Sequence, residues 1–447
     1  MTALSTAQPY AGSTRRERVG WYFYSFADHA FFTTMLAVFI GPYLTSLAKN
    51  AADADGRVHP LGIPVAAGSY YPYLIAVSVL LSVLVLPLVG AVADRSAHRK
   101  WLLAGFAFTG AGLTCCFALA TGTAYLFGGL LYLLANIALN AASVVANSFL
   151  TRLVGADERD ATSSRGWAIG YLGGGLNLAL CLAAVLTAHE SPAAIRGVFV
   201  FAGLWWAGFT VLPLLWLRER PPLEAEPDAG GGVLSAGFRQ LRRTLAHLRA
   251  YPLTLLFLLA FLVYNDGVQT VIALASTYGT QELQLSDATL AVTILIVQFV
   301  AFGGALLLGF VASRAGAKRT ILGSLVGWTA LVVAAYFVPA KAPLVFMALG
   351  AAIGLVLGGS QALSRSLFSQ LIPAGKEAEY FGFYGISDKG SSWLGPLLFG
   401  VVNQVVGNYR AAIVSLVVFF VAGFVLLLAV PVRRAIVAAG NTPPRVL

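Results

Sequence analysis

The chain has 447 residues, of which 58% are hydrophobic and only 11% are charged. A soluble globular protein carries about 25% charged residues, so most of this surface must face something other than water. The net charge of +10 does not indicate a nucleic-acid partner, because the basic residues form short clusters between long apolar runs, the placement that orients membrane proteins.

The chain opens with a polar segment, residues 1–20, in which Arg15, Arg16 and Arg18 precede the first apolar run. That run covers residues 21–47 and is longer than the apolar region of a signal peptide, which has about 7–15 residues. We therefore interpret it as an uncleaved first membrane span and residues 1–20 as a cytoplasmic tail.

Twelve segments are apolar over the length that a membrane-spanning helix needs, about 20 residues. Lipid offers no hydrogen-bond partner to the backbone, so each segment is predicted to be helical. The predicted fold is an all-α polytopic membrane protein with spans at about residues 21–47, 70–93, 101–121, 125–150, 166–188, 197–217, 252–277, 288–312, 320–338, 343–368, 379–406 and 410–431.

The distribution of basic residues predicts the orientation. Loops on one side of the spans, together with both terminal segments, hold most of the 29 Lys and Arg residues, whereas the other side holds Lys49, Arg57, Arg196, Lys341 and Arg410. Basic loops remain in the cytoplasm, so we expect both termini there, in a multi-pass protein of the plasma membrane.

A polar segment at residues 218–251 separates an N-terminal half, residues 21–217, from a C-terminal half, residues 252–431, which a tail at 432–447 follows. Its Pro and Gly clusters indicate a flexible linker. Leucines and arginines then recur on opposite faces at helical spacing, which predicts a basic amphipathic helix on the inner leaflet. We interpret this helix as a surface strut, with a regulatory partner site as the alternative.

The two halves carry related loops. The segment Gly90–Lys100 and the segment Gly309–Arg319 share a glycine, an arginine and a terminal basic pair at corresponding positions. A second pair of related segments, 151–154 and 369–372, repeats at nearly the same spacing. Six spans followed by six more, inserted in the same sense, is the parallel-repeat plan of many transporters.

The first of these loops resembles the signature of the major facilitator superfamily, Gly-x-x-x-Asp-Arg-x-Gly-Arg-Arg-Lys, with Ala97 and His98 as departures. The resemblance implies that Asp94 engages a neighbouring helix end and helps to hold one conformational state. The second copy has Ser313 at that position, so only the N-terminal half should carry such a latch. The alternative is a tight turn with basic anchors. The predicted latch loop comprises Gly90, Asp94, Arg95, Arg99, Lys100 and Arg314.

Three further segments resemble the fungal vacuolar amino-acid effluxer family and its bacterial relatives within that superfamily. They are residues 166–175, residues 264–270, and residues 364–368 followed by 381–385. The resemblance implies a secondary transporter of amino-acid-like solutes. The first span departs from the relatives' pattern Tyr-Asp-x-Ala-Asn-Ser-Ala, since residues 24–30 read Tyr-Ser-Phe-Ala-Asp-His-Ala. The substrate is therefore not inferred from the resemblance.

Ionisable side chains inside spans are costly and usually mark a transport pathway. Asp28 and Asp266 each lie in the first span of a half, and in the superfamily these spans line the central cavity. We predict that both carboxylates face it, either to exchange protons or to bind the ammonium group of a substrate. For Asp266 the alternative is a structural pair with Asn265 or Gln269.

Three neighbouring residues complete the predicted site. His29 titrates near neutral pH and could share a proton with Asp28, although an interior histidine bonded to a backbone carbonyl is the alternative. Asp388 and Lys389 lie within one span. Lys389 is expected to meet a carboxylate such as Asp28, or a substrate carboxylate.

The sequence contains no nucleotide-binding loop, nucleophile elbow or zinc signature, so we expect neither an enzyme nor a bound metal or cofactor. We predict a secondary active transporter of a small polar solute that uses alternating access and is coupled to protons. Its expected partners are the lipid bilayer, the solute and the proton, and it is expected to be a monomer. The alternative is a receptor or scaffold that keeps the fold without transport.

Overall fold

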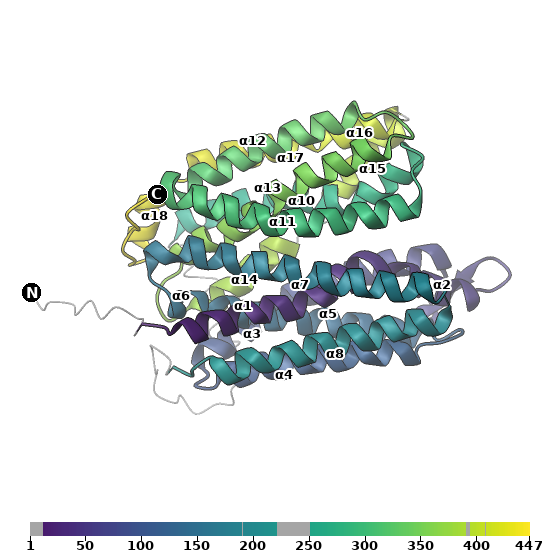
Figure 1. Cartoon of the computed structure of the whole chain (residues 1–447), viewed down its shortest axis with the longest axis horizontal. Coiled ribbons are helices and arrows are strands. Elements are labelled where there is room, and N and C mark those ends of the chain that lie inside the picture. Colours follow the sequence, from purple (N-terminus) through teal and green to yellow (C-terminus); the bar gives the residue numbers. More distant parts are fainter. Residues whose placement is uncertain (1–11, 190, 221–250, 390–393, 407) are drawn as a thin grey trace, which may run out of the picture.

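The computed structural model describes residues 12–189, 191–220, 251–389, 394–406 and 408–447, without the side chains of Asp287 and Lys389. Two groups of helices lie side by side, the N-terminal half in purple to blue and the C-terminal half in green to yellow (Figure 1). In the described part, eleven helices are long and apolar enough to cross a membrane. The helical bundle predicted from composition is confirmed.

The N-terminal half is helical apart from a two-stranded antiparallel sheet in the loop between its first two spans. Short 3-10 turns cover Pro60–Gly62, Ala67–Ser69, Phe117–Leu119 and Ala156–Glu158. The longer elements are α1 (Arg15–His29), η1 (Ala30–Phe39), α2 (Ile40–Asn50), β1 (Arg57–Val58), β2 (Val65–Ala66), α3 (Tyr70–Arg95), α4 (Arg99–Cys116), α5 (Tyr125–Ser148), α6 (Leu150–Leu153), α7 (Arg159–Thr187) and α8 (Pro192–Trp216).

The C-terminal half contains α10 (Pro252–Gln281), α11 (Asp287–Ala315), α12 (Ala317–Tyr336), α13 (Pro343–Gln370), α14 (Glu377–Lys389), α15 (Leu394–Val406), α16 (Tyr409–Ser415), α17 (Val417–Ala429) and α18 (Val432–Ala438). The span predicted at 379–406 corresponds to α14 and α15, on either side of residues 390–393, which lie outside the described residues. The amphipathic helix predicted in the 218–251 linker also lies outside them.

The first helix begins earlier than hydropathy indicates. The Glu17 N–H donates to Thr14 Oγ1 at 3.2 Å, and the Thr14 N–H donates to Glu17 Oε2 at 2.8 Å. This capping box starts α1 at Arg15, inside the predicted tail, because it satisfies backbone donors that water would otherwise have to bind. From His29 the chain continues through the π-helical segment η1 into α2.

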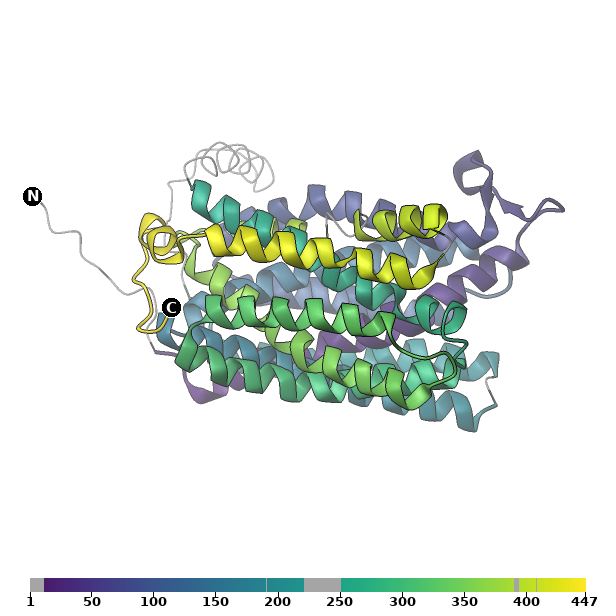
Figure 2. The ribbon, with the colours of Figure 1, turned by 90° about the horizontal axis from the view of Figure 1, so that it is seen from above.

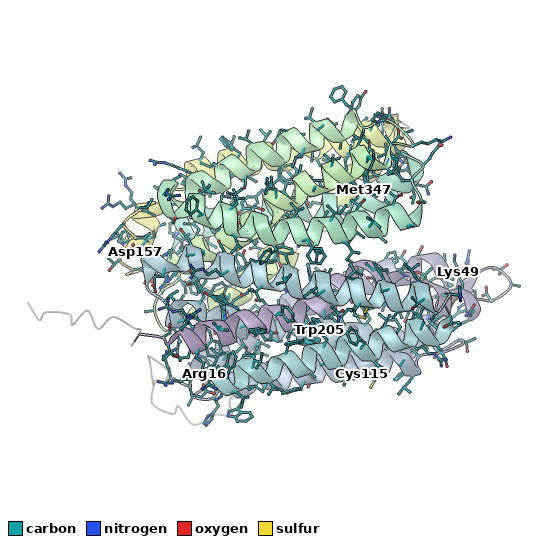
Figure 3. The ribbon with its side chains drawn as sticks, viewed as in Figure 1. Arg16, Lys49, Cys115, Asp157, Trp205 and Met347 are labelled. Atoms are coloured by element: carbon teal, nitrogen blue, oxygen red, sulfur yellow. The ribbon has the colours of Figure 1, made fainter. Side chains whose placement is uncertain are left out.

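Helix α1 begins at the same end of the bundle at which α18 lies, and we call this the terminal end (Figures 1 and 2). Arg16 and Asp157 lie at the terminal end, whereas Lys49 lies at the opposite end (Figure 3). The start of α1 and the C-terminal end of the chain thus lie on one side of the bundle.

The predicted C-terminal tail is partly ordered against the bundle. After α18, Asn441 Nδ2 donates to the carbonyls of Gln370 and Ile372 at 2.9 and 2.7 Å. The Arg445 N–H donates to Asp157 Oδ1 in the N-terminal half at 2.7 Å. The tail therefore contacts both halves at the terminal end.

Across the middle of the molecule, α7 packs against α11 and α13, and α3 packs against α14. Within the N-terminal half, side-chain amides join helices, since Asn136 donates to Ser78 at 2.6 Å and Asn140 donates to Ser82 at 3.3 Å. Inside lipid the hydrophobic effect does not favour contact between helices, so such polar contacts help to hold the helices together.

Candidate functional site

Asp28 and His29 form a buried pair at the end of α1. His29 Nδ1 lies 2.8 Å from Asp28 Oδ1, and each residue is only 8% exposed. The imidazole contacts Trp167 and Tyr171 of α7 edge-on, with ring centroids 5.5 and 5.7 Å apart. His29 is thus bonded to a carboxylate, and the alternative of a bond to a backbone carbonyl is wrong.

The backbone around the Asp28–His29 pair allows the His29 ring to pack closely against α7. A Cβ atom at Gly170 would collide with the His29 ring, so glycine at this position of α7 lets the imidazole approach the helix. The α-helix changes to the π-helical η1 directly after His29. Single π-helical turns often occur at functional sites, because they redirect side chains without ending the helix.

Arg365 of α13 is a buried cation that crosses from the C-terminal half to the N-terminal half. Its Nε and Nη2 donate to the Ser163 hydroxyl and carbonyl, each at 2.9 Å, and Nη1 donates to Asn147 Oδ1 at 3.1 Å. The guanidinium carbon lies 4.8 Å from the ring centroid of Trp21 and 5.5 Å from that of Trp167. The guanidinium and the His29 imidazole both lie against the Trp167 ring, which places Arg365 close to the Asp28–His29 pair.

The sequence prediction missed Arg365 as a site residue. The predicted span ended at residue 368, so Arg365 lay near its end and was not among the buried charges considered for the site. In the structure α13 runs to Gln370 and Arg365 is 6% exposed. The polar residues around Arg365 could have indicated that it faces the interior of the bundle. This segment is too polar to face lipid, since it contains Ser360, Gln361, Ser364, Ser366 and Ser369.

Asp266 lies in a different environment from Asp28. It is fully buried in α10, and its carboxylate oxygens accept no side-chain hydrogen bond among the described residues. Its own carbonyl accepts the Thr270 hydroxyl at 2.7 Å. The structure therefore does not join Asp28 and Asp266 by a direct contact.

The residues beside Asp266 form a polar chain of their own. Asn265 Nδ2 donates to the Asp388 carbonyl and carboxylate, each at 3.0 Å, and Gln361 Nε2 donates to Asn265 Oδ1 at 2.8 Å. Gln269 is half-buried one turn along α10. The alternative in which Asp266 pairs with Asn265 is wrong, because the Asn265 amide bonds to α13 and α14. The expected contact of Lys389 concerns a side chain outside the described residues.

Asp94 of the latch loop accepts backbone hydrogen bonds from the other half. The N–H groups of Ala378 and Glu379, in the first turn of α14, donate to its Oδ1 and Oδ2 at 2.9 and 2.8 Å. Arg99 Nη2 donates to the same Oδ1 at 2.7 Å. A carboxylate is favourable here because the first amides of a helix lack partners within the helix.

The rest of the latch loop surrounds this contact. A Cβ atom at Gly90 would collide with the Ala378 carbonyl, so glycine permits the close approach of α3 and α14. Arg95 is exposed, and the Lys100 N–H donates to Glu219 at 3.0 Å. In the second copy, Arg314 lies 3.6 Å from the Phe310 ring centroid.

Further contacts close the terminal end between α7 and α13. Arg159 Nη1 donates to the Ser369 carbonyl at 2.7 Å, the Ser163 hydroxyl donates to the Ala362 carbonyl at 2.7 Å, and Gln370 Nε2 donates to the Ala156 carbonyl at 2.9 Å. We call these contacts, together with those of Arg365, the inter-half seal. The Asp28–His29 pair lies deeper in the bundle than this seal.

Replacing Asp94 with asparagine should loosen the terminal end. The amide supplies one acceptor where the carboxylate supplies two, and a hydrogen bond to a charged group contributes about 1.5–3 kcal/mol, so the open population should rise about tenfold or more. The measurement uses a protein in which the three native cysteines are replaced and one cysteine is introduced at Ser369, which is buried in the seal. Maleimide should label this cysteine about tenfold faster in the Asp94→Asn variant than in the same background with Asp94.

Ser313→Ala is the matched control for this test. Ser313 occupies the corresponding position of the second loop, and its hydroxyl donates to the Phe310 carbonyl of its own helix at 2.7 Å. The substitution should leave labelling unchanged. Equal labelling in Asp94→Asn and the unsubstituted background would contradict a role for Asp94 in holding the terminal end closed.

Among the described residues, no group of three or more His, Cys, Asp or Glu side chains could hold a metal ion. The geometry instead offers an acid–imidazole pair and a guanidinium from opposite halves, both inside a membrane-spanning bundle. Such an arrangement can bind and release charged groups of a solute and can take up a proton.

Comparison with known families agrees with this architecture. A sequence model of the family described as "Vacuole effluxer Atg22 like" matches residues 13–440. The chain is 29% identical over 425 residues to an uncharacterized MFS-type transporter, YxiO, of Bacillus subtilis, covering 94% of this chain and 95% of the relative. It is 27% identical over 460 residues to Autophagy-related protein 22-1 of Aspergillus niger, covering 84% and 75%.

Solved structures show the same fold. The human organic anion transporter MFSD10 (TETRAN) superposes with a TM-score of 0.69 at 18% identity, covering 92% of this chain and 99% of that one. A bacterial homologue of the iron transporter ferroportin in the outward-facing state gives a TM-score of 0.61 at 14% identity, covering 95% and 98%. The fold is therefore that of the major facilitator superfamily.

Proposed function

We propose that this chain carries a small zwitterionic solute by proton-coupled alternating access. The premise is that the chain belongs to the Atg22-like vacuole effluxer family of major facilitator transporters. The family and the fold make it a membrane transporter and not an enzyme. The solute, the coupling ion and the location in the cell belong to the proposal.

The observation that carries the proposal is the meeting of opposite charges from the two halves. Asp28 of α1 and Arg365 of α13 are both almost fully buried. Trp167 lies against both the Arg365 guanidinium and the His29 imidazole that Asp28 contacts. A solute with an ammonium and a carboxylate group could bind Asp28 with the first and Arg365 with the second. This arrangement supports an amino-acid-like substrate.

Asp28 and His29 supply the proton-coupling group in this proposal. The His29 imidazole lies 2.8 Å from the Asp28 carboxylate, so the two groups can share a proton. Asp266 is the second candidate, since it is a buried carboxylate without a side-chain partner in the described part of the chain. Buried ionisable groups of membrane proteins commonly serve such relays.

Alternating access would use the two sets of contacts at the terminal end. The seal and Asp94 hold the halves together there, and opening would break both sets while the halves rock about the buried site. We further propose that the terminal end is cytoplasmic, from the basic loops, and that the protein functions as a monomer in the cell membrane.

Transport in proteoliposomes tests the function. Purified protein should exchange some members of an amino-acid panel, and an imposed pH gradient of one unit should drive accumulation of about tenfold for one proton per solute. Flux that ignores the gradient would remove the proton coupling. The absence of flux for every solute would favour the alternative, a receptor or scaffold on the same fold.

A further inference from the structure

A basic cavity lies at the turn between α17 and α18. It has a volume of about 760 Å³ and is lined by Lys318 of α12, by Val430 and Pro431 of the turn, and by Arg433, Arg434 and Val437 of α18. The Lys318 ammonium donates to the carbonyls of Leu428 and Val430 at 2.9 and 2.7 Å, which fixes a positive charge at the cavity wall. This cavity is separate from the buried site between the halves.

The basic residues of the cavity have no Asp or Glu side chain as an ion-pair partner in the described part of the chain. Within the described residues, none of Lys318, Arg433 and Arg434 forms an ion pair with a carboxylate. Residues 309–336 and 408–447, which contain the cavity wall, include neither Asp nor Glu. Arg433 and Arg434 are exposed. The cavity is therefore electrostatically suited to an anion.

An apolar stripe leads from the cavity along α17. Val418, Val421, Val425 and Leu428 are 62, 48, 58 and 57% exposed, and their spacing of three and four residues places them on one face of the helix. In a membrane protein such a face lies against acyl chains. The stripe ends at Leu428, whose carbonyl accepts the Lys318 ammonium.

We propose that the cavity binds the headgroup of an anionic phospholipid whose acyl chain lies along the stripe of α17. A phosphate in the cavity would face three cations, and the chain attached to it would cover exposed valine and leucine side chains. Basic pockets at the membrane surface bind anionic lipids through this combination of charge and apolar contact. A soluble anion would use only the charges.

The test is lipid binding by native mass spectrometry on the full-length protein in detergent. Dioleoyl phosphatidylglycerol should bind at least about tenfold more tightly than dioleoyl phosphatidylcholine. The double variant Arg433→Gln/Arg434→Gln should weaken phosphatidylglycerol binding about thirtyfold and leave phosphatidylcholine binding unchanged. Unchanged binding of the neutral lipid shows that this variant is folded.

A charge-matched control separates the cavity from general attraction to a basic surface. Arg314→Gln/Arg319→Gln removes the same charge from exposed arginines at the same end of the bundle and should retain phosphatidylglycerol binding. An equal loss in the two double variants, or equal binding of the two lipids, would overturn the proposal. Competition by glycerol phosphate as strong as that by the lipid would also overturn it, since the site would then bind a free anion.

Discussion

Replacing Arg365 with glutamine is expected to reduce solute flux at least about a hundredfold, which corresponds to about 2.8 kcal/mol. The substitution removes three hydrogen bonds from a charged group to the N-terminal half and the stacking against Trp21 and Trp167. Hydrogen bonds to charged groups contribute about 1.5–3 kcal/mol each, so the loss of these bonds can account for the expected fall in solute flux. It also removes the cation proposed to bind the solute carboxylate.

Two further variants show whether the effect belongs to this position. Arg365→Lys keeps the charge but cannot form the forked contacts to Ser163 and Asn147, so flux should recover only in part. Arg410→Gln is the matched control, because Arg410 donates to Glu282 Oε1 at 2.7 Å and to the Tyr336 carbonyl at 2.6 Å within the C-terminal half. It should transport like the unsubstituted protein. Normal flux in Arg365→Gln would remove Arg365 from both the site and the seal.

Replacing Asp28 with asparagine should abolish accumulation driven by a pH gradient while exchange of solute at equal pH continues more slowly. Asparagine keeps the size of the side chain but cannot take up a proton. Under one unit of pH gradient, accumulation should fall from about tenfold to none. The measurement is the ratio of internal to external solute at steady state in proteoliposomes, with exchange measured in the same preparation.

Asp53→Asn is the control for this prediction. Asp53 also contacts a histidine, with Oδ2 2.9 Å from His59 Nε2, but it lies in the exposed loop between the first two spans. Its substitution should leave accumulation intact. Asp266→Asn, measured in parallel, decides whether the second buried carboxylate shares the role. Accumulation that survives in both Asp28→Asn and Asp266→Asn would contradict the assignment of either acid to proton coupling.

The fold could be predicted because lipid imposes a simple rule on sequence. Spans must be long, apolar and helical, and the predicted segments recur as helices in the described part of the chain. The errors occur at helix ends, where hydropathy carries little information. Capping by Thr14 and Glu17 starts α1 early, and the polar segment around Arg365 continues α13 to Gln370.

The site was harder to predict because it depends on contacts between distant segments. The sequence placed His29 beside Asp28, but the bond between their side chains is a property of the fold, and the approach of Arg365 to the same region requires the packing of α13 on α7. Adjacent residues on a helix point about 100° apart, which explains why Asn265 and Asp266 reach different partners. Motif resemblance was informative for Asp94 because its partners are backbone N–H groups, which any sequence supplies.

The two related loops show how the halves differ. Asp94 bonds to the opposite half, whereas the corresponding Ser313 bonds to its own helix. The internal repeat therefore provides two loops of similar sequence. Among the described residues, only the first loop bonds to the opposite half through the side chain at this position. Of the two related loops, only the first therefore helps to close the terminal end, together with the inter-half seal.

The position of Arg365 against two indole rings has an optical consequence. Tryptophan emission depends on nearby charge and on contact with water, and separation of the halves would withdraw the guanidinium from Trp21 and Trp167 together. The protein thus contains its own fluorophores at the moving boundary. Spectral shifts on addition of solute, compared between the native chain and a Trp167→Phe variant, would follow opening in real time without an attached dye.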